Sequence, residues 1–183
     1  MRTSAAILLS ALLLAAESGE KPHIANLAVS LQAGNIDVGF VLANVFDEDL
    51  VERIQTGLPT GFDFKLKLVK SQRWWWIDPD LRTTEFHVIA MYNAVTGEYL
   101  VNYKQDGKLI NSRVVREISE LRDAMTRFEN LRLFTVEGLD TKKRLWVLAR
   151  ANLGSRHLLS LIPMTIQTDW AESRRFRLPE TPG

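Results

Sequence analysis

The chain has 183 residues, of which 46% are hydrophobic and 25% are charged, a balance that excludes a disordered or collagen-like protein. Lys and Arg number 23 against 22 Asp and Glu, so the formal net charge of +1 argues against a nucleic-acid binder. The absence of cysteine excludes disulfides, thiolate metal sites and cysteine nucleophiles. This length predicts one domain with a short extension.

The first 18 residues have the pattern of a secretory signal peptide. Arg2 precedes the apolar run Ala5–Ala16, and Ser18 supplies a small residue before the expected cut. The run is shorter than the roughly 20 apolar residues that cross a bilayer. The sequence therefore predicts that residues 1–18 are removed and that the chain is exported, to the periplasm or beyond the cell. The alternatives are that the segment stays as an uncleaved anchor or forms a buried helix.

Alternating segments predict a mostly β chain. In residues 60–70, apolar side chains at positions 62, 64, 66 and 68 alternate with charged ones at 63, 65 and 67. This pattern is typical of an antiparallel strand with one face on a core and one in water. The further predicted strands are 24–31, 36–42, 86–92, 99–103, 131–136, 144–152 and 158–166.

Two segments have helical periodicity instead. Asp47 is placed to cap a short helix that ends at Gly57. Ser112 is predicted to cap a second helix, because a stripe of apolar residues follows it at helical spacing. The stripe consists of Val114, Ile118, Leu121, Met125 and Phe128.

These elements predict the architecture of the mature chain. Eight or nine short strands with only two helices favour an antiparallel β-sandwich, with the two short helices packed on it. A single domain is expected over residues 19–177. The last residues, 178–183, include two prolines and are expected to form a disordered tail.

No catalytic motif stands out. His23, His87 and His157 lack the spacing of metal ligands, and no nucleophile-elbow motif surrounds any serine. The run 78–80, Asp-Pro-Asp, is better explained as a turn than as part of a cation site. The sequence therefore predicts a protein that is not an enzyme and that uses neither a metal nor a cofactor.

The segment Arg73-Trp74-Trp75-Trp76 is the candidate binding site. On a strand, Trp75 and Arg73 would face opposite to Trp74 and Trp76, so one core cannot cover all three rings. Trp and Arg are favoured at the centres of protein interfaces. The alternative is that a helix, such as the one expected over 113–128, covers the second face.

The C-terminal third is a second candidate, because basic residues outnumber acidic ones there. Such a patch suits an acidic partner or an anionic lipid, and the alternative is an ordinary solvated face. The basic residues are Lys142, Lys143, Arg144, Arg150, Arg156, Arg174, Arg175 and Arg177, against Asp169 and Glu172.

Several motifs, in their order along the chain, resemble the bacterial domain-of-unknown-function 4390 family. The resemblance covers nearly all of the mature chain and implies a small, exported, mostly β protein with no known activity. Members are often encoded beside sensor kinase genes, which hints at an envelope or signalling partner. The motifs are 57–60 (GLPT), 62–66 (FDFKL), 74–78 (WWWID), 92–99 (YNAVTGEY) and 169–173 (DWAES), with Phe176.

Two functional hypotheses follow. The first is a periplasmic interaction module that binds an envelope protein through Arg73–Trp76 or through the basic C-terminal third. The second is a carrier or sensor that holds an apolar or glycan ligand, which needs a concave pocket of roughly a few hundred Å³. An enzyme ranks third, because no acid, base or nucleophile converges in the sequence.

Overall fold

The structure of the chain is a computed structural model that describes residues 20–71, 80–140, 142–158 and 162–179. Within these ranges the chain forms ten strands and two helices. In order they are β1 (His23–Gln32), β2 (Asn35–Ala43), α1 (Glu48–Gln55), β3 (Thr60–Lys70), β4 (Asp80–Asn93), β5 (Glu98–Gln105), β6 (Lys108–Val115), α2 (Ile118–Thr126), β7 (Arg127–Thr135), β8 (Leu145–Leu158), β9 (Ile162–Gln167) and β10 (Ala171–Glu172).

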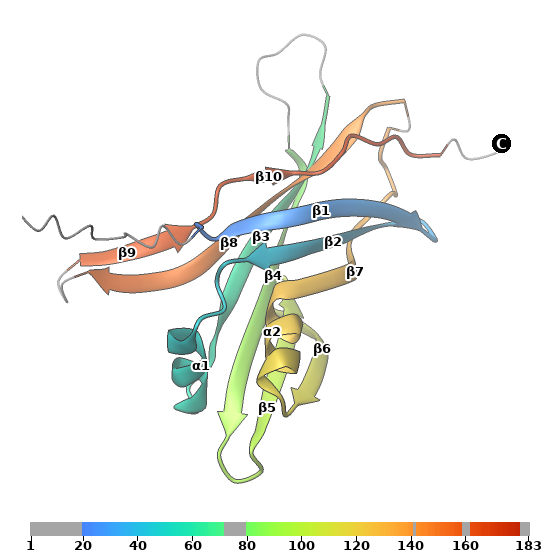
Figure 1. The fold of residues 1–183 in the computed structure, drawn as a ribbon. Helices are drawn as coiled ribbons and strands as arrows, with labels where there is room; N and C mark the ends of the chain where they lie inside the picture. The colour runs from blue at the N-terminus through green and yellow to red at the C-terminus, as the bar shows by residue number, and fades with distance from the viewer. Residues whose placement is uncertain (1–19, 72–79, 141, 159–161, 180–183) are drawn as a thin grey trace, which may run out of the picture.

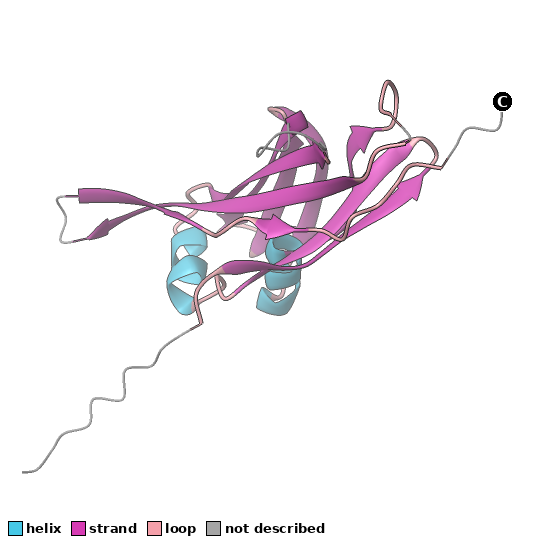
Figure 2. Cartoon of the chain, turned by 90° about the horizontal axis from the view of Figure 1, so that it is seen from above, coloured by secondary structure: helices cyan, strands magenta, loops and turns pink. Residues whose placement is uncertain are grey.

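The strands form two antiparallel sheets. The small sheet has the order β1-β2-β7, and the large sheet has the order β10-β8-β3-β4-β5-β6, with β9 also paired to β8. In Figure 1 the small sheet runs across the strands of the large one. The two helices lie side by side at one end of the small sheet, as Figure 2 shows from above. The predicted mostly β, sandwich-like fold is confirmed.

The alternation of β3 builds the centre of the core. Phe62, Phe64, Leu66 and Leu68 are each 5% exposed or less, while Asp63 and Lys65 point to solvent, as predicted. Three phenylalanine rings from both sheets meet around Phe64, with ring centres 5.1, 5.8 and 5.2 Å from its own. The partner rings are Phe40, Phe86 and Phe128.

The predicted first helix is confirmed as α1. The Asp47 carboxylate accepts a hydrogen bond from the Leu50 backbone N–H at 2.9 Å, which satisfies one of the free donors at the helix start. Gly57 follows the helix with a φ of +82°, a conformation that glycine adopts without steric cost. The side chains of Leu50 and Ile54 are buried and pack α1 against the core.

The predicted start of the second helix is wrong. Ser112 lies in β6 and pairs with Asn102 of β5. The helix α2 begins only at Ile118, where the Glu120 carboxylate accepts a hydrogen bond from the Glu117 N–H. Because residues 108–115 pair with β5, Val114 stays in a strand and is 60% exposed, instead of extending the helical stripe. Phe128, the last residue of the expected stripe, belongs to β7 and is buried there.

The C-terminal residues were predicted less well than the rest. The strand β10 was not predicted, and it pairs with β8 through Ala171 and Ala149. Leu178 was expected to begin a disordered tail, but it is 5% exposed and packs in the core. The expected signal peptide and residues 180–183 lie outside the described residues. In the described part of the chain, no helix has the length and apolarity needed to span a membrane.

Candidate binding surface on the outer face of the large sheet

The predicted site residues Arg73, Trp74, Trp75 and Trp76 lie outside the described residues, so their split between two faces stays a prediction. The structure does place the two ends of their segment. Lys70 pairs with Leu145 of β8 where β3 ends, and Val69 pairs with Asp80 where β4 begins. The segment therefore joins the large sheet beside β8.

The large sheet has an outer face that points away from the core. In β8, Leu145, Val147, Ala149 and Ala151 belong to the core, so the alternating residues face outward. One of them, Trp146, is only 5% exposed, and it pairs with Val69 of β3, which is 2% exposed. These two residues form a small second apolar cluster on the outer face, separate from the main core.

Cationic side chains lie over two tryptophan rings of this face. The Arg150 guanidinium carbon is 4.6 Å from the ring centre of Trp170, and Lys67 Nζ is 5.3 Å from it. The Arg175 guanidinium carbon is 4.7 Å from the ring centre of Trp146. Such contacts contribute about 0.5–1 kcal/mol each at exposed sites and hold the ring in place. We call these five residues the aromatic–cationic strip.

The structure brings part of the basic C-terminal third to this surface. An isolated bridge between Leu145 and Phe176 sets Trp146 opposite Arg175 and Arg144 opposite Arg177. Arg144 and Arg177 are exposed at the same end of the sheet, and Lys142 and Lys143 are exposed in the loop before β8. The side chain of Arg156 lies outside the described part.

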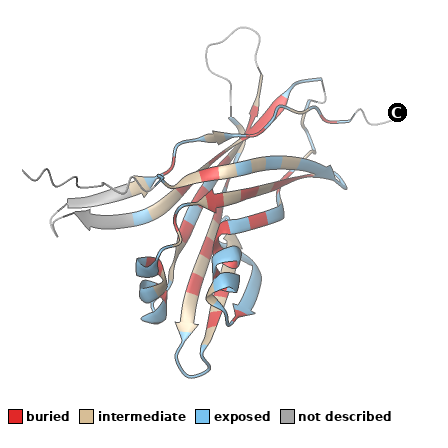
Figure 3. Ribbon diagram, viewed as in Figure 1, coloured by how far each residue is buried: buried red, intermediate tan, exposed pale blue. Residues whose placement is uncertain are grey.

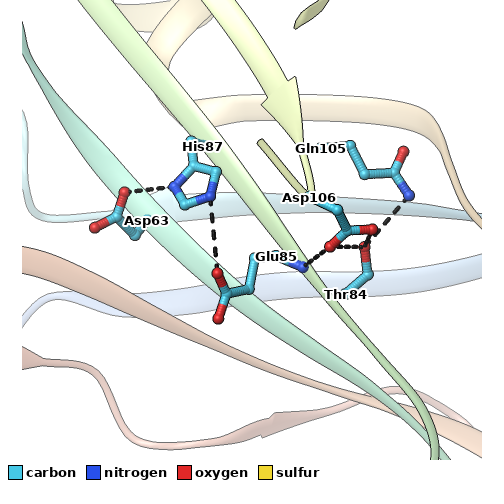
Figure 4. Close-up of polar contacts among 6 residues, drawn as sticks. All are labelled: Asp63, Thr84, Glu85, His87, Gln105 and Asp106. Carbon is cyan, nitrogen blue, oxygen red and sulfur yellow. Dashed lines mark hydrogen bonds and ion pairs between the residues drawn. The ribbon is translucent and has the colours of Figure 1, made fainter. Parts of the chain in front are cut away.

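A histidine sits between two carboxylates farther along the outer face (Figure 4). His87 Nδ1 lies 2.7 Å from Asp63 Oδ1, and His87 Nε2 lies 4.0 Å from Glu85 Oε2. These three residues, the histidine cluster, line a shallow depression of about 290 Å³ together with Lys65 and Arg150. His87 alternates along β4 with the buried Phe86 and Val88, and its side chain is 24% exposed.

A second polar group in Figure 4 holds β4 against the β5–β6 hairpin. The Thr84 hydroxyl donates to the Asp106 carboxylate at 3.0 Å, and the Glu85 N–H donates to the same carboxylate at 2.8 Å. Gln105 adds a bond from Nε2 to the Thr84 hydroxyl at 3.3 Å. This network fixes the strand that carries His87.

The side chains around the histidine cluster can form ion pairs and hydrogen bonds with a bound molecule. The depression at the histidine cluster is lined by acidic, basic, amide and phenyl side chains, and no serine, threonine or cysteine is among them. In the described ranges, no group of three or more His, Asp or Glu side chains is placed to hold a metal ion. His23 lies in β1, where its Nδ1 is 3.0 Å from the Lys21 carbonyl oxygen.

The sequence did not indicate Trp146 and Trp170 as a pair. Each stands alone among polar or aliphatic neighbours, unlike the consecutive Trp74–Trp76. The outward alternation of Lys65 and Lys67 was a usable signal for the face. Which cationic side chain lies over which tryptophan ring depends on how the C-terminal segment packs beside β8. No local sequence pattern predicts that packing.

The comparisons with known proteins agree with the motifs. Neither a curated protein nor a solved structure matches the chain. The sequence model of the family described as Domain of unknown function (DUF4390) matches residues 20–174, and the chain therefore belongs to that family.

Proposed function

We propose that this protein is an exported interaction module that binds a partner protein of the cell envelope through the outer face of the large sheet. The observation that carries the proposal is the aromatic–cationic strip. A solvated sheet face needs no tryptophan, yet Trp170 stands 36% exposed with Arg150 and Lys67 over its ring. Trp and Arg are the residues most enriched among interface hot spots.

The charges of the strip favour an acidic partner surface. Lys67 is already paired with Asp80 at 2.6 Å. Among the described residues, no carboxylate lies within 4.0 Å of the Arg150 or Arg175 guanidinium. Two arginines held over rings and without an ion pair can donate to carboxylates of a partner without first breaking a bond.

The Trp-rich segment belongs to the same proposal. It leaves the sheet at Lys70 and returns at Asp80, next to the apolar cluster of Val69 and Trp146. The two attachment points of this segment therefore lie beside Trp146 of the strip. The sensor-kinase neighbourhood suggested by the family resemblance makes an envelope signalling protein the first partner to test.

Affinity isolation with matched variants tests the proposal. The tagged full chain, Trp170→Ala, Arg150→Glu and the control Val95→Ala are isolated from the cells that express them, and the co-purifying proteins are identified and titrated. Val95 is 95% exposed and lies in the β4–β5 turn, away from the strip. Trp170→Ala should weaken binding of the identified partner by about thirtyfold, a hot-spot loss of roughly 2 kcal/mol, and Val95→Ala should not. Equal binding by all four proteins would overturn the proposal.

A carrier is the second candidate, because one cleft has a suitable size. A cavity of about 480 Å³ lies between α1 and the adjoining ends of β3, β8 and β9. Its apolar lining includes Val45, Leu50, Phe62, Leu153 and Ile166. Binding of a fluorescent fatty acid that is lost in Leu153→Trp, which would fill the cleft, would favour the carrier. No binding of the fatty acid by the wild-type chain would exclude an apolar ligand of this kind.

A further inference from the structure

Strand β6 is a free edge of the large sheet. It stands at the end of the strand order and pairs only with β5 among the described strands. Every residue from Lys108 to Val114 is exposed, and Figure 3 shows this strand in pale blue along almost its whole length. Three of these residues are large and apolar: Leu109 and Val114 are each 60% exposed and Ile110 is 49% exposed. An unpaired edge with exposed apolar side chains is a template for another strand.

A groove runs beside this edge. It has a volume of about 570 Å³ and separates β6 from β7, which is itself an edge of the small sheet. Ile110 and Arg113 line one side, and Leu131 and Arg132 line the other. Ile110 is the extra residue of a bulge, because Asn111 pairs with Tyr103 while Leu109 pairs with Lys104. A strand added to β6 would therefore place alternate side chains into the groove.

The charges of the edge select the kind of strand. Residues 108–116 include Lys108, Arg113 and Arg116 and no acidic residue. Arg116 is paired with Glu98 at 2.6 Å, whereas no described carboxylate lies within 4.0 Å of Lys108 or Arg113. A second copy of β6 would set basic residues against basic residues, so self-pairing is opposed. An acidic strand is the complement.

We propose that β6 binds an extended, acidic segment of a partner protein as an added strand of the large sheet. Backbone hydrogen bonds along the free edge would hold the segment. Apolar side chains of the segment would cover Leu109 and Val114 on one face of the edge, and its carboxylates would meet Lys108 and Arg113 on the other face. The proposal stands on β6 alone and does not depend on the aromatic–cationic strip.

Peptides of alternating residues test the edge directly. The probe is a labelled peptide of alternating valine and glutamate with the length of β6, 8 residues, and its counterpart of valine and lysine. Fluorescence anisotropy with the purified full chain should show binding of the acidic peptide and not of the basic one. Methylating the backbone nitrogens of either the valines or the glutamates removes the donors on one side of the peptide. One of these two methylated peptides should lose binding and the other should keep it.

Protein variants locate the site. Arg113→Glu should weaken binding of the acidic peptide at least tenfold. Arg53 is an exposed arginine on α1, and Arg53→Glu should leave that binding unchanged. Trp170→Ala should also leave it unchanged, so a failure here is distinguishable from a failure of the proposed function. Equal binding of acidic and basic peptides, or no difference between Arg113→Glu and Arg53→Glu, would overturn the proposal. So would a dimer in sedimentation that Leu109→Glu dissociates, because β6 would then pair with a second copy.

Discussion

Phe64 shows how single residues of β3 divide between core and solvent. Its side chain is 1% exposed and meets three other phenylalanine rings, whereas its neighbour Lys65 points to solvent. Phe64→Ala should lower the free energy of unfolding by about 3–5 kcal/mol, because it leaves a cavity among rings that cannot collapse onto it. Lys65→Ala should change it by less than about 0.5 kcal/mol. Urea unfolding of both variants checks this, and the reverse order of effects would mean that the register is off by one residue.

The buried phenol of Tyr103 makes the stability of the protein depend on pH in the alkaline range. Burial raises the pKa of Tyr103 above its ordinary value of 10.0, and the positive charge of Arg113 acts against that rise. The unfolded chain therefore releases the phenol proton at a lower pH than the folded chain, so stability falls as the pH rises through 10. Urea unfolding at about pH 9 and about pH 11 should show a smaller fall for Tyr103→Phe than for wild type.

The control for this prediction is Tyr92→Phe, which removes a half-buried phenol and retains Tyr103. The fall in its free energy of unfolding between the two pH values should match that of wild type. Tyr103→Phe also loses the hydrogen bond from Tyr103 to the Ala124 carbonyl, 2.9 Å long, so the comparison uses the change between the two pH values rather than the absolute stability. If the free energy of unfolding fell equally in all three proteins, groups other than Tyr103 would cause the loss of stability at alkaline pH.

At the scale of elements, the pairing of β3 with β4 requires a glycine. A Cβ atom on Gly61 would lie 1.9 Å from the Val88 carbonyl oxygen and 2.9 Å from the Ile89 Cα. Both atoms are backbone, so the strands must move apart to admit a side chain. Gly61→Ala should cost about 1–3 kcal/mol, as overpacking does, against a near-neutral Lys65→Ala in the same strand. A neutral Gly61→Ala would show that β3 and β4 approach each other less closely at this point.

Elements with complete local signals were the ones that the sequence predicted. The helix α1 has its cap at Asp47 and its glycine at position 57, and β3 has unbroken alternation. The prediction of a helix over residues 112–117 was wrong because the spacing of Val114 and Ile118 fits a helix as well as a strand. Pairing with β5 decides between them, and that contact is distant in sequence.

The same reason limits what could be predicted of the candidate site. Alternation alone predicted that Lys65 and Lys67 lie on the face of β3 that points away from the core. The position of Trp170 near Lys67 and Arg150 depends on β10 pairing with β8, and a strand of two residues leaves almost no pattern to read. The cationic side chain that lies over each tryptophan ring is therefore set by the tertiary fold and cannot be predicted from the local sequence.

At the scale of the whole molecule, the described part of the chain leaves Trp170 and the β6 edge exposed, as the proposed binding roles require. Export would bring these surfaces to envelope partners. We expect the mature chain to begin at Gly19 and to be recovered from the periplasm, because Arg2, the apolar run and Ser18 together match the pattern of a cleavable signal. Mass spectrometry of the periplasmic fraction measures this. An intact Met1 terminus in the cytosol would contradict it.

The most direct test of the outer face as a binding surface is site-specific photo-crosslinking in the cells that express the protein. A photoreactive residue replaces Trp170 in one strain and the control Val95, 95% exposed in the β4–β5 turn, in another. We expect a discrete adduct with one partner at position 170, lost when Arg150→Glu is added, and no such adduct at position 95. Absence of an adduct at position 170, or the same adducts at both positions, would contradict the account.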